Sequence, residues 1–258
     1  MTPSTMTDLG HHAGAVAGLP GDLASIVSVV QGLFIHEAWA DRYGVKVDDP
    51  DTAQLRRTAD LLDAAGVRPL GEARDPADRV PTMCRSFSVA TVAMLRAHGI
   101  DARARAGFAT YFLPGFHEDH WIVELREGDR WRRADPQIDE LQREALKLGF
   151  DPLDIPDGGF LTGSEAWQLI RSGQADPHSF GFSGDPDLRG QWFVAGSVIL
   201  DRGALAGVET LPWDVWGPMP GPDEEVDVAL FDRIAAGEQP VDPPVEVVNQ
   251  RRGTREKL

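Results

Sequence analysis

The sequence is poor in cysteine and in basic residues, and each scarcity excludes a class of protein. Its single cysteine cannot form an internal disulfide, so cysteine usage gives no sign of an oxidising compartment. Its 25 Lys and Arg residues stand against 41 Asp and Glu residues, which gives a formal net charge of −16. Nucleic acids and anionic membranes are bound through clustered basic side chains. We therefore expect neither a nucleic acid nor a membrane among the partners of this protein.

Long apolar runs are also missing. Residues 1–8 lack the basic region and the apolar stretch of a secretory signal. The most apolar segment, residues 23–35, is interrupted by small and polar side chains and is too short to span a bilayer. These absences predict a cytoplasmic protein.

The sequence does contain enough apolar surface for a core, since 42% of its residues are hydrophobic. Apolar residues at helical spacing predict three helices, over residues 22–41, 51–65 and 84–98. Alternating apolar and polar residues predict a strand over 102–112, and two shorter strands follow over 120–126 and 129–135. Three further helices are predicted, over 164–172, 189–207 and 223–236. Together these elements predict an α+β fold.

The composition changes along the chain and divides it into four parts. Residues 1–18 are small, polar and uncapped, which predicts disorder. We expect residues 19–145 to form the core and residues 146–238 to form a mostly helical segment packed on it. Residues 239–258 begin with several prolines, which predicts a flexible tail. The aromatic residues of the C-terminal part are expected to build a second packing layer or, alternatively, to cover a cleft and select the substrate: Trp167, Trp192, Phe193, Trp213 and Trp216.

Cys84 opens the predicted helix over residues 84–98 and is a candidate nucleophile. The thiolate is the nucleophilic form of cysteine. A helix N-terminus carries partial positive charge and unpaired N–H groups, which stabilise a thiolate. The same N–H groups can stabilise the oxyanion of a tetrahedral intermediate. On composition alone, the alternative is a small buried helix residue, which is the usual role of a lone cysteine.

His120 and Asp135 lie on the two short predicted strands, which meet at a glycine that suits a tight hairpin. If the loop is Glu127-Gly128, His120 lies directly opposite Asp135. If the loop is Gly128-Asp129, His120 faces Gln137, and Asp135 lies on the adjacent diagonal of the same face. A three-residue loop separates the two side chains unless a bulge intervenes, because side chains alternate along a strand. Two of three simple registers therefore allow the aspartate to orient the imidazole, as in a catalytic triad.

The order Cys84, His120, Asp135 and its local context resemble the transglutaminase-like cysteine enzymes, relatives of the papain-type proteases. The resemblance covers residues 80–140. It rests on Cys84-Arg85-Ser86-Phe87-Ser88, Leu95-Arg96-Ala97-His98-Gly99-Ile100-Asp101-Ala102-Arg103, Asp119-His120-Trp121, and the strand from Trp131 to Asp135-Pro136. It implies a Cys-His-Asp triad on a papain-like core, in which the nucleophile-bearing helix packs on an antiparallel sheet. It also implies reactions through a thioester acyl-enzyme.

Gln31 is a polar residue within the first apolar helix. In the family that the sequence resembles, an upstream side chain often completes the oxyanion hole. Gln31 is therefore a candidate to donate its amide N–H to the developing negative charge. The alternative is a helix face turned to solvent.

We expect no cofactor and no metal. A helical zinc motif needs two histidines four residues apart on one helix, whereas His117 and His120 are three apart in a segment that leads into a strand. A metal-dependent hydrolase centred on these two histidines is the weaker alternative. His11 and His12 lie in the terminal segment and are expected to be inert.

The residues thus predict thiol-dependent acyl transfer or hydrolysis on an amide or an ester, within a small molecule or a peptide. Cys84 attacks the carbonyl, His120 acts as base and then as acid, and Asp135 orients His120. The alternative from another class is a non-catalytic binding module that keeps the same fold.

Overall fold

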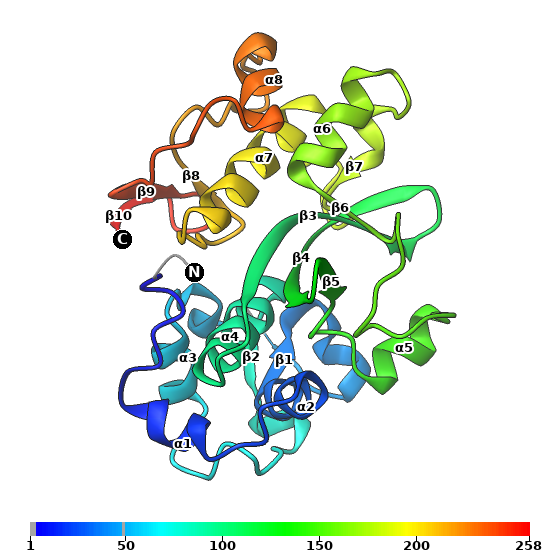
Figure 1. Ribbon diagram of the computed structural model, residues 1–258. Coiled ribbons are helices and arrows are strands. Elements are labelled where there is room, and N and C mark those ends of the chain that lie inside the picture. Colours follow the sequence, from blue (N-terminus) through cyan, green and yellow to red (C-terminus); the bar gives the residue numbers. More distant parts are fainter. Residues whose placement is uncertain (1–3, 48–49) are drawn as a thin grey trace. The chain divides into compact units, whose positions relative to one another are not determined.

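The protein is described from a computed structural model, which defines residues 4–47 and 50–258 (Figure 1). The chain divides into two compact units. The first comprises residues 1–104 and 122–155, and the second comprises residues 105–121 and 156–258. Two long strands, β3 (Ala102–Leu113) and β4 (Phe116–Glu127), contribute residues to both units. The mixture of helices with mainly antiparallel strands confirms the predicted α+β fold class.

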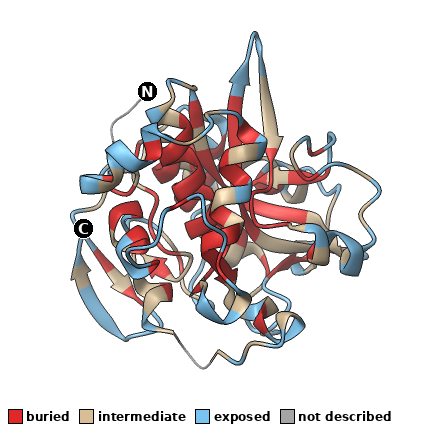
Figure 2. Cartoon of the chain, turned by 90° about the horizontal axis from the view of Figure 1, so that it is seen from below, coloured by how far each residue is buried: buried red, intermediate tan, exposed pale blue. Residues whose placement is uncertain are grey.

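The first unit is built around α4 (Cys84–Ala97), in which every residue from Cys84 to Leu95 is buried (Figure 2). Helix α2 (Leu23–Leu33) packs against α4. Near this contact, the rings of Phe34 and Phe87 meet edge to face, with 5.7 Å between their centroids. The unit also contains η1 (Gly10–His12), α1 (Ala13–Ala17), η2 (Glu37–Tyr43), η3 (Asp51–Gln54), α3 (Thr58–Ala64), η4 (Pro76–Asp78) and α5 (Glu140–Leu146).

A short parallel strand pair positions the start of α4. Strand β1 (Phe34–His36) directly follows α2, and β2 (Val80–Thr82) leads into α4. The pairing of these strands explains why α2 ends at Leu33, well before the predicted end at residue 41, because buried strand residues follow it. The predicted helix over 51–65 is likewise divided, into η3 and α3. At the far end of α4, Gly99 adopts a φ of +76°, as expected of a glycine that ends a helix.

The N-terminal segment differs from the expected disorder over residues 1–18. Residues 4–18 contain η1 and α1, and residues 1–3 lie outside the described part of the chain. Met6, Leu9 and Val16 are buried. These three apolar side chains dock a segment that is otherwise small and polar.

Strand β5 (Arg130–Ala134) forms an antiparallel hairpin with β4. The observed register pairs Glu127 with Arg130 and Val123 with Ala134, so the loop is Gly128-Asp129. This is one of the two registers predicted to bring His120 and Asp135 to the same face. Strand β4 begins at Phe116, four residues before the predicted start at 120, and therefore includes His117.

The second unit combines strand pairs with a helical cluster. Strand β3 pairs with β6 (Phe160–Thr162), and β4 pairs in parallel with β7 (Phe180–Gly181). Helices α6 (Gly163–Arg171), α7 (Gln191–Leu205) and α8 (Val228–Ala236) pack on one another, and η5 (Pro177–Ser179) precedes β7. Trp167 and Trp216 lie in the hydrophobic core of this unit, and Phe193 packs against it, as the packing-layer alternative predicted.

The C-terminal residues also differ from the expected flexible tail over 239–258. Strands β8 (Asp214–Val215), β9 (Glu246–Asn249) and β10 (Thr254–Lys257) form an antiparallel sheet in the order β10-β9-β8. The boundaries of the units differ from the expected division at residue 145 as well. The second unit consists of residues 105–121 and 156–258, so its later part begins at residue 156 and not at residue 146.

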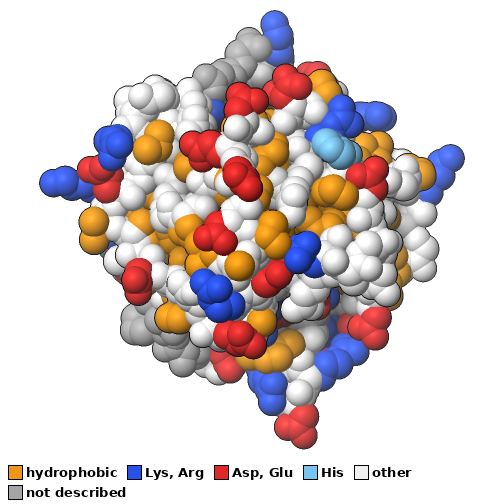
Figure 3. Space-filling view, turned by 90° about the horizontal axis from the view of Figure 1, so that it is seen from above, with side chains coloured by type: hydrophobic (Ala, Val, Ile, Leu, Met, Phe, Trp, Pro, Cys, Tyr) orange, Lys and Arg blue, Asp and Glu red, His pale blue; other side chains and the backbone are white. Residues whose placement is uncertain are grey.

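Charged side chains of both signs lie scattered among apolar ones on the face shown in Figure 3. On that face the acidic side chains do not gather in one patch. Among residues 4–47 and 50–258, no helix has the length and apolar character needed to cross a membrane.

Candidate active site

Cys84 is the first residue of α4, and the residue is 7% exposed. The preceding residue, Met83, has an extended backbone and makes no side-chain hydrogen bond to the helix start. Its carbonyl accepts the N–H of Ser86 at 2.9 Å, which fixes the first turn. The free thiol of Cys84 therefore lies at the end of α4 that carries the partial positive charge of the helix.

Asp135 lies directly after β5 and is fully buried. Its N–H donates to the carbonyl of Pro152 at 2.8 Å, and its Oδ1 accepts the N–H of Gln137 at 2.9 Å. The carboxylate is thereby fixed at the end of the hairpin, within the same unit as Cys84.

Gln31 contacts the segment after Asp135 from helix α2. Its Nε2 donates to the carbonyl oxygens of Pro136 and Ile138, each at 3.1 Å. A primary amide nitrogen carries two hydrogens, and both are used here. This arrangement differs from the predicted oxyanion role, because no amide hydrogen of Gln31 is left for a substrate. The side chain instead braces the turn that carries Asp135.

A second polar network, which no sequence motif indicated, continues from this brace. Gln137 donates to Gln142 at 3.0 Å, Gln142 donates to the hydroxyl of Tyr43 at 3.1 Å, and that hydroxyl donates to Asp139 at 2.8 Å. Burial raises the pKa of Tyr43 well above its usual range. The hydroxyl therefore stays protonated and keeps its donor role at all ordinary pH values. One feature of the sequence could have indicated this network, namely that Gln137 directly follows Asp135-Pro136.

His120 lies on β4 in the part of the strand that belongs to the second unit, and it is 2% exposed. The rings of Phe112 and Tyr111 from β3 contact the imidazole edge-on, with centroid distances of 4.9 Å and 6.3 Å. Such contacts restrict the rotation of the imidazole ring.

The two carboxyl groups that precede His120 in the sequence, those of Glu118 and Asp119, both have raised pKa values. Burial raises the pKa of Glu118, and the N–H of Ser183 opposes this by donating to its carboxylate. Burial, with repulsion from Glu118, raises the pKa of Asp119 from its ordinary value of 3.8 to about 7. Because the folded-state pKa is raised, protonated Asp119 stabilises the fold; this contribution is complete below about pH 4 and is lost as the pH rises through about 7.

The strand geometry argues against a metal site on His117 and His120. Both residues lie on β4, and residues three apart on a strand point to opposite faces. The His117 ring stacks on Phe180 at a centroid distance of 4.0 Å, and its Nδ1 lies 3.2 Å from the carbonyl oxygen of Ser179. His117 is therefore a packing residue of the second unit.

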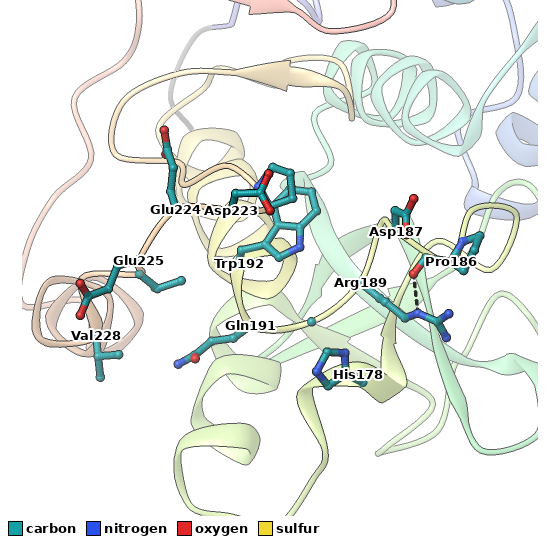
Figure 4. Close-up of a pocket in the computed structure, with 13 residues that line it drawn as sticks. His178, Pro186, Asp187, Arg189, Gln191, Trp192, Asp223, Glu224, Glu225 and Val228 are labelled. Carbon is teal, nitrogen blue, oxygen red and sulfur yellow. Dashed lines mark hydrogen bonds between the residues drawn. The ribbon is translucent and has the colours of Figure 1, made fainter.

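The second unit also contains an open pocket of about 820 Å³ (Figure 4). Trp192 of α7 and Arg189 line it together with the acidic loop before α8, which includes Asp223, Glu224 and Glu225. The Nε of Arg189 donates to the carbonyl of Pro186 at 2.6 Å. Trp192 thus lines a pocket, whereas Trp167 and Trp216 serve the core, and the pocket lining includes none of the predicted catalytic residues.

The structure thus combines an α+β architecture with a free thiol at the start of a buried helix, ahead of an antiparallel hairpin. The family comparison makes this more specific: residues 70–136 match the model of the transglutaminase-like superfamily. The matched segment contains Cys84 and His120 and ends one residue after Asp135. This confirms the resemblance found in the sequence, and it supports a cysteine-based enzyme in general.

One solved structure similar to this chain is a proposed cysteine protease from Cytophaga hutchinsonii. The two chains share 16% identity and align with a TM-score of 0.40. The alignment covers 62% of this chain and 43% of that one, so this chain spans less than half the length of its relative. No curated protein matches the sequence.

Proposed function

We propose that this protein is a thiol-dependent acyltransferase or hydrolase that acts on an amide or an ester through a thioester on Cys84. The observation that carries the proposal is the position of the chain's single cysteine, at the uncapped start of the buried helix α4 and inside the transglutaminase-like segment. His120 is proposed as the general base and Asp135 as the residue that orients it. The proposed substrate is a small molecule or a peptide.

The chemistry follows from these three roles. His120 takes the thiol proton, the sulfur bonds to the substrate carbonyl carbon, and the carbonyl oxygen becomes an oxyanion. The N-terminal N–H groups of α4 stabilise that charge. His120 then returns the proton to the leaving amine or alcohol as its bond to the carbonyl carbon breaks, which leaves a thioester. Attack by water or by a second amine on the thioester releases the acyl group and restores the thiol.

The hairpin register supports the role of Asp135. If the pairing of β4 with β5 continues three residues toward the start of β4, His120 lies opposite Gln137 and Asp135 lies on the adjacent diagonal. At such positions Cβ atoms are about 7–8 Å apart or less, which two side chains can bridge. The bracing of the segment after Asp135 by Gln31 fits the same role.

Because Cys84 is the single cysteine, labelling experiments on this protein report on one known atom. Iodoacetamide at neutral pH is expected to alkylate Cys84 faster than it alkylates a free thiol such as glutathione. His120→Ala is expected to slow the reaction, because the thiol then loses its base. A rate no faster than that of glutathione, and equal in both proteins, would favour the non-catalytic module.

Intact mass spectrometry tests the thioester directly. After incubation with a panel of peptide amides and small-molecule amides and esters, the wild-type protein is expected to gain the mass of one acyl group. Cys84→Ala is the matched control and is expected to gain none. An acyl adduct that persists in Cys84→Ala, or turnover that survives this substitution, would overturn the proposed mechanism.

A further inference from the structure

Three side chains that can ligate a metal meet in the N-terminal part of the first unit. His11 and His12 belong to η1, and Asp63 lies near the end of α3. The Nε2 atom of His12 is 2.7 Å from Oδ1 of Asp63, and the Nε2 atom of His11 is 3.5 Å from the same oxygen. The two imidazole rings lie beside each other, with 3.9 Å between their centroids. The three ligand atoms all lie within 4.8 Å of one another.

The contacts around this group hold η1 against α3. The carbonyl of Met6 accepts the N–H and the hydroxyl of Thr58, at 2.8 Å and 2.9 Å. The carbonyl of Asp8 accepts the N–H of Ala59 at 3.1 Å, and its carboxylate pairs with Arg57 at 2.9 Å. These contacts come from backbone and side chains outside the histidines, so the two ligand-bearing elements are positioned before any ion binds.

Gly10 aligns the histidines with the carboxylate. It has a φ of +52°, and a Cβ atom there would lie 3.2 Å from the Cβ of Ala59. Asp63 follows Ala59 by four residues, so both lie on the same face of α3. The His12 side chain is only 12% exposed, whereas those of His11 and Asp63 are 74% and 55% exposed. The group is therefore fixed on one side and open to an ion on the other.

The distances fit a tetrahedral ion. Zinc binds imidazole nitrogen and carboxylate oxygen at about 2.0–2.2 Å, which places neighbouring ligand atoms of a tetrahedral site about 3.3 Å apart. The observed separations of 2.7 Å and 3.5 Å lie on either side of this value. For an ion to replace the hydrogen that His12 and Asp63 share, their ligand atoms must move apart from 2.7 Å to about 3.3 Å.

We propose that His11, His12 and Asp63 bind one divalent transition-metal ion, with Zn²⁺ as the best match. Imidazole nitrogen favours zinc, copper or nickel over magnesium and calcium, which prefer oxygen ligands. The ion joins η1 to α3 and so fastens the N-terminal segment to the rest of the first unit. This assignment departs from the expectation that the two histidines are inert and that no metal is bound, and it involves none of the proposed catalytic residues.

Equilibrium dialysis of the whole protein against zinc chloride tests the site. The wild-type protein is expected to bind one ion, and its Tm is expected to rise with zinc but not with magnesium. His11→Ala, His12→Ala and Asp63→Asn are each expected to weaken zinc binding at least about tenfold, since the loss of outer partners of a ligand already costs about 10–100-fold. Circular dichroism checks that each variant is folded.

Two control variants locate the ion. His178→Gln removes an exposed imidazole of the second unit and is expected to bind zinc as the wild-type protein does. Cys84→Ser is expected to do the same, although zinc also binds thiolates. The proposal is overturned if the wild-type protein takes up no stoichiometric zinc, if the three ligand variants bind it unchanged, or if either control loses it.

Discussion

Replacing Gln31 by methionine separates two roles for this side chain, a brace for the segment after Asp135 and a donor to an oxyanion. Methionine has a similar length but no polar hydrogens. The substitution therefore removes both donations to the carbonyl oxygens of Pro136 and Ile138 and changes the packing of α2 little. If Gln31 is the brace that these contacts indicate, the fold itself loses stability.

The expected loss can be worked out from the two hydrogen bonds. A neutral hydrogen bond contributes about 0.5–1.5 kcal/mol net, and both hydrogen bonds are partly buried, so we expect a loss of about 2 kcal/mol. For a protein of this size that lowers the Tm by about 4–8 °C. Gln31→Glu is expected to cost more, because its carboxylate places negative oxygens opposite the two carbonyl oxygens.

Urea unfolding followed by tryptophan fluorescence measures this loss, with the midpoint compared at an unchanged slope. Gln168→Met, on an exposed position of α6, is the matched control and is expected to change stability by less than about 0.5 kcal/mol. An unchanged midpoint for Gln31→Met would refute the brace. If turnover then fell about 100–1,000-fold at full stability, the oxyanion role predicted from the sequence would be correct.

Three further substitutions test the electrostatics and packing of the second unit. The free energy of unfolding of the wild-type protein is expected to fall by about 2–3 kcal/mol between about pH 5 and about pH 8, as the pH passes through the raised pKa of Asp119, and Asp119→Asn is expected to remove this dependence, measured as urea midpoints at these two pH values. Gly107→Ala places a Cβ in steric conflict with the carbonyl oxygen of Leu161, so the Tm is expected to fall by an amount equivalent to at least about 1–3 kcal/mol; an unchanged Tm contradicts the pairing of β3 with β6. Asp201→Ala removes the carboxylate that lies 2.7 Å from the buried guanidinium of Arg105 and is expected to lower the free energy of unfolding in urea by about 3–5 kcal/mol, whereas Arg105→Met with Asp201→Leu recovers much of it.

The part of the fold that local patterns predict is the part that local interactions form. Helix α4 begins at Cys84 as predicted, and its residues are buried on all faces, as its nearly continuous apolar run indicates. Gly99 ends it with a positive φ, which is a property of one residue type at one position. The hairpin loop at Gly128-Asp129 is also local, and it was among the registers expected from the sequence alone.

The features that the sequence did not predict depend on residues far apart in the chain. Gln31 donates hydrogen bonds to Pro136 and Ile138, which lie 105 and 107 positions further along the chain. No local sequence pattern predicts such a pairing. The N-terminal segment seemed disordered because its composition is polar, yet three buried side chains and backbone hydrogen bonds to α3 order it. Periodicity also missed the end of α2 at Leu33, since the strand that follows forms only by pairing with β2.

The candidate site contains both kinds of feature, those formed by local interactions and those formed by residues far apart in the chain. The proposed nucleophile owes its position to a helix start, which a sequence shows directly. The proposed orienting carboxylate owes its position to a turn that Gln31 and the Pro152 carbonyl hold from elsewhere in the first unit. Substitutions distant from Cys84 in sequence are therefore expected to impair the chemistry by displacing Asp135, with Cys84 and the start of α4 left intact. Activity lost through Gln31→Met together with a lowered urea midpoint, with iodoacetamide still alkylating Cys84, would be the signature of that indirect route.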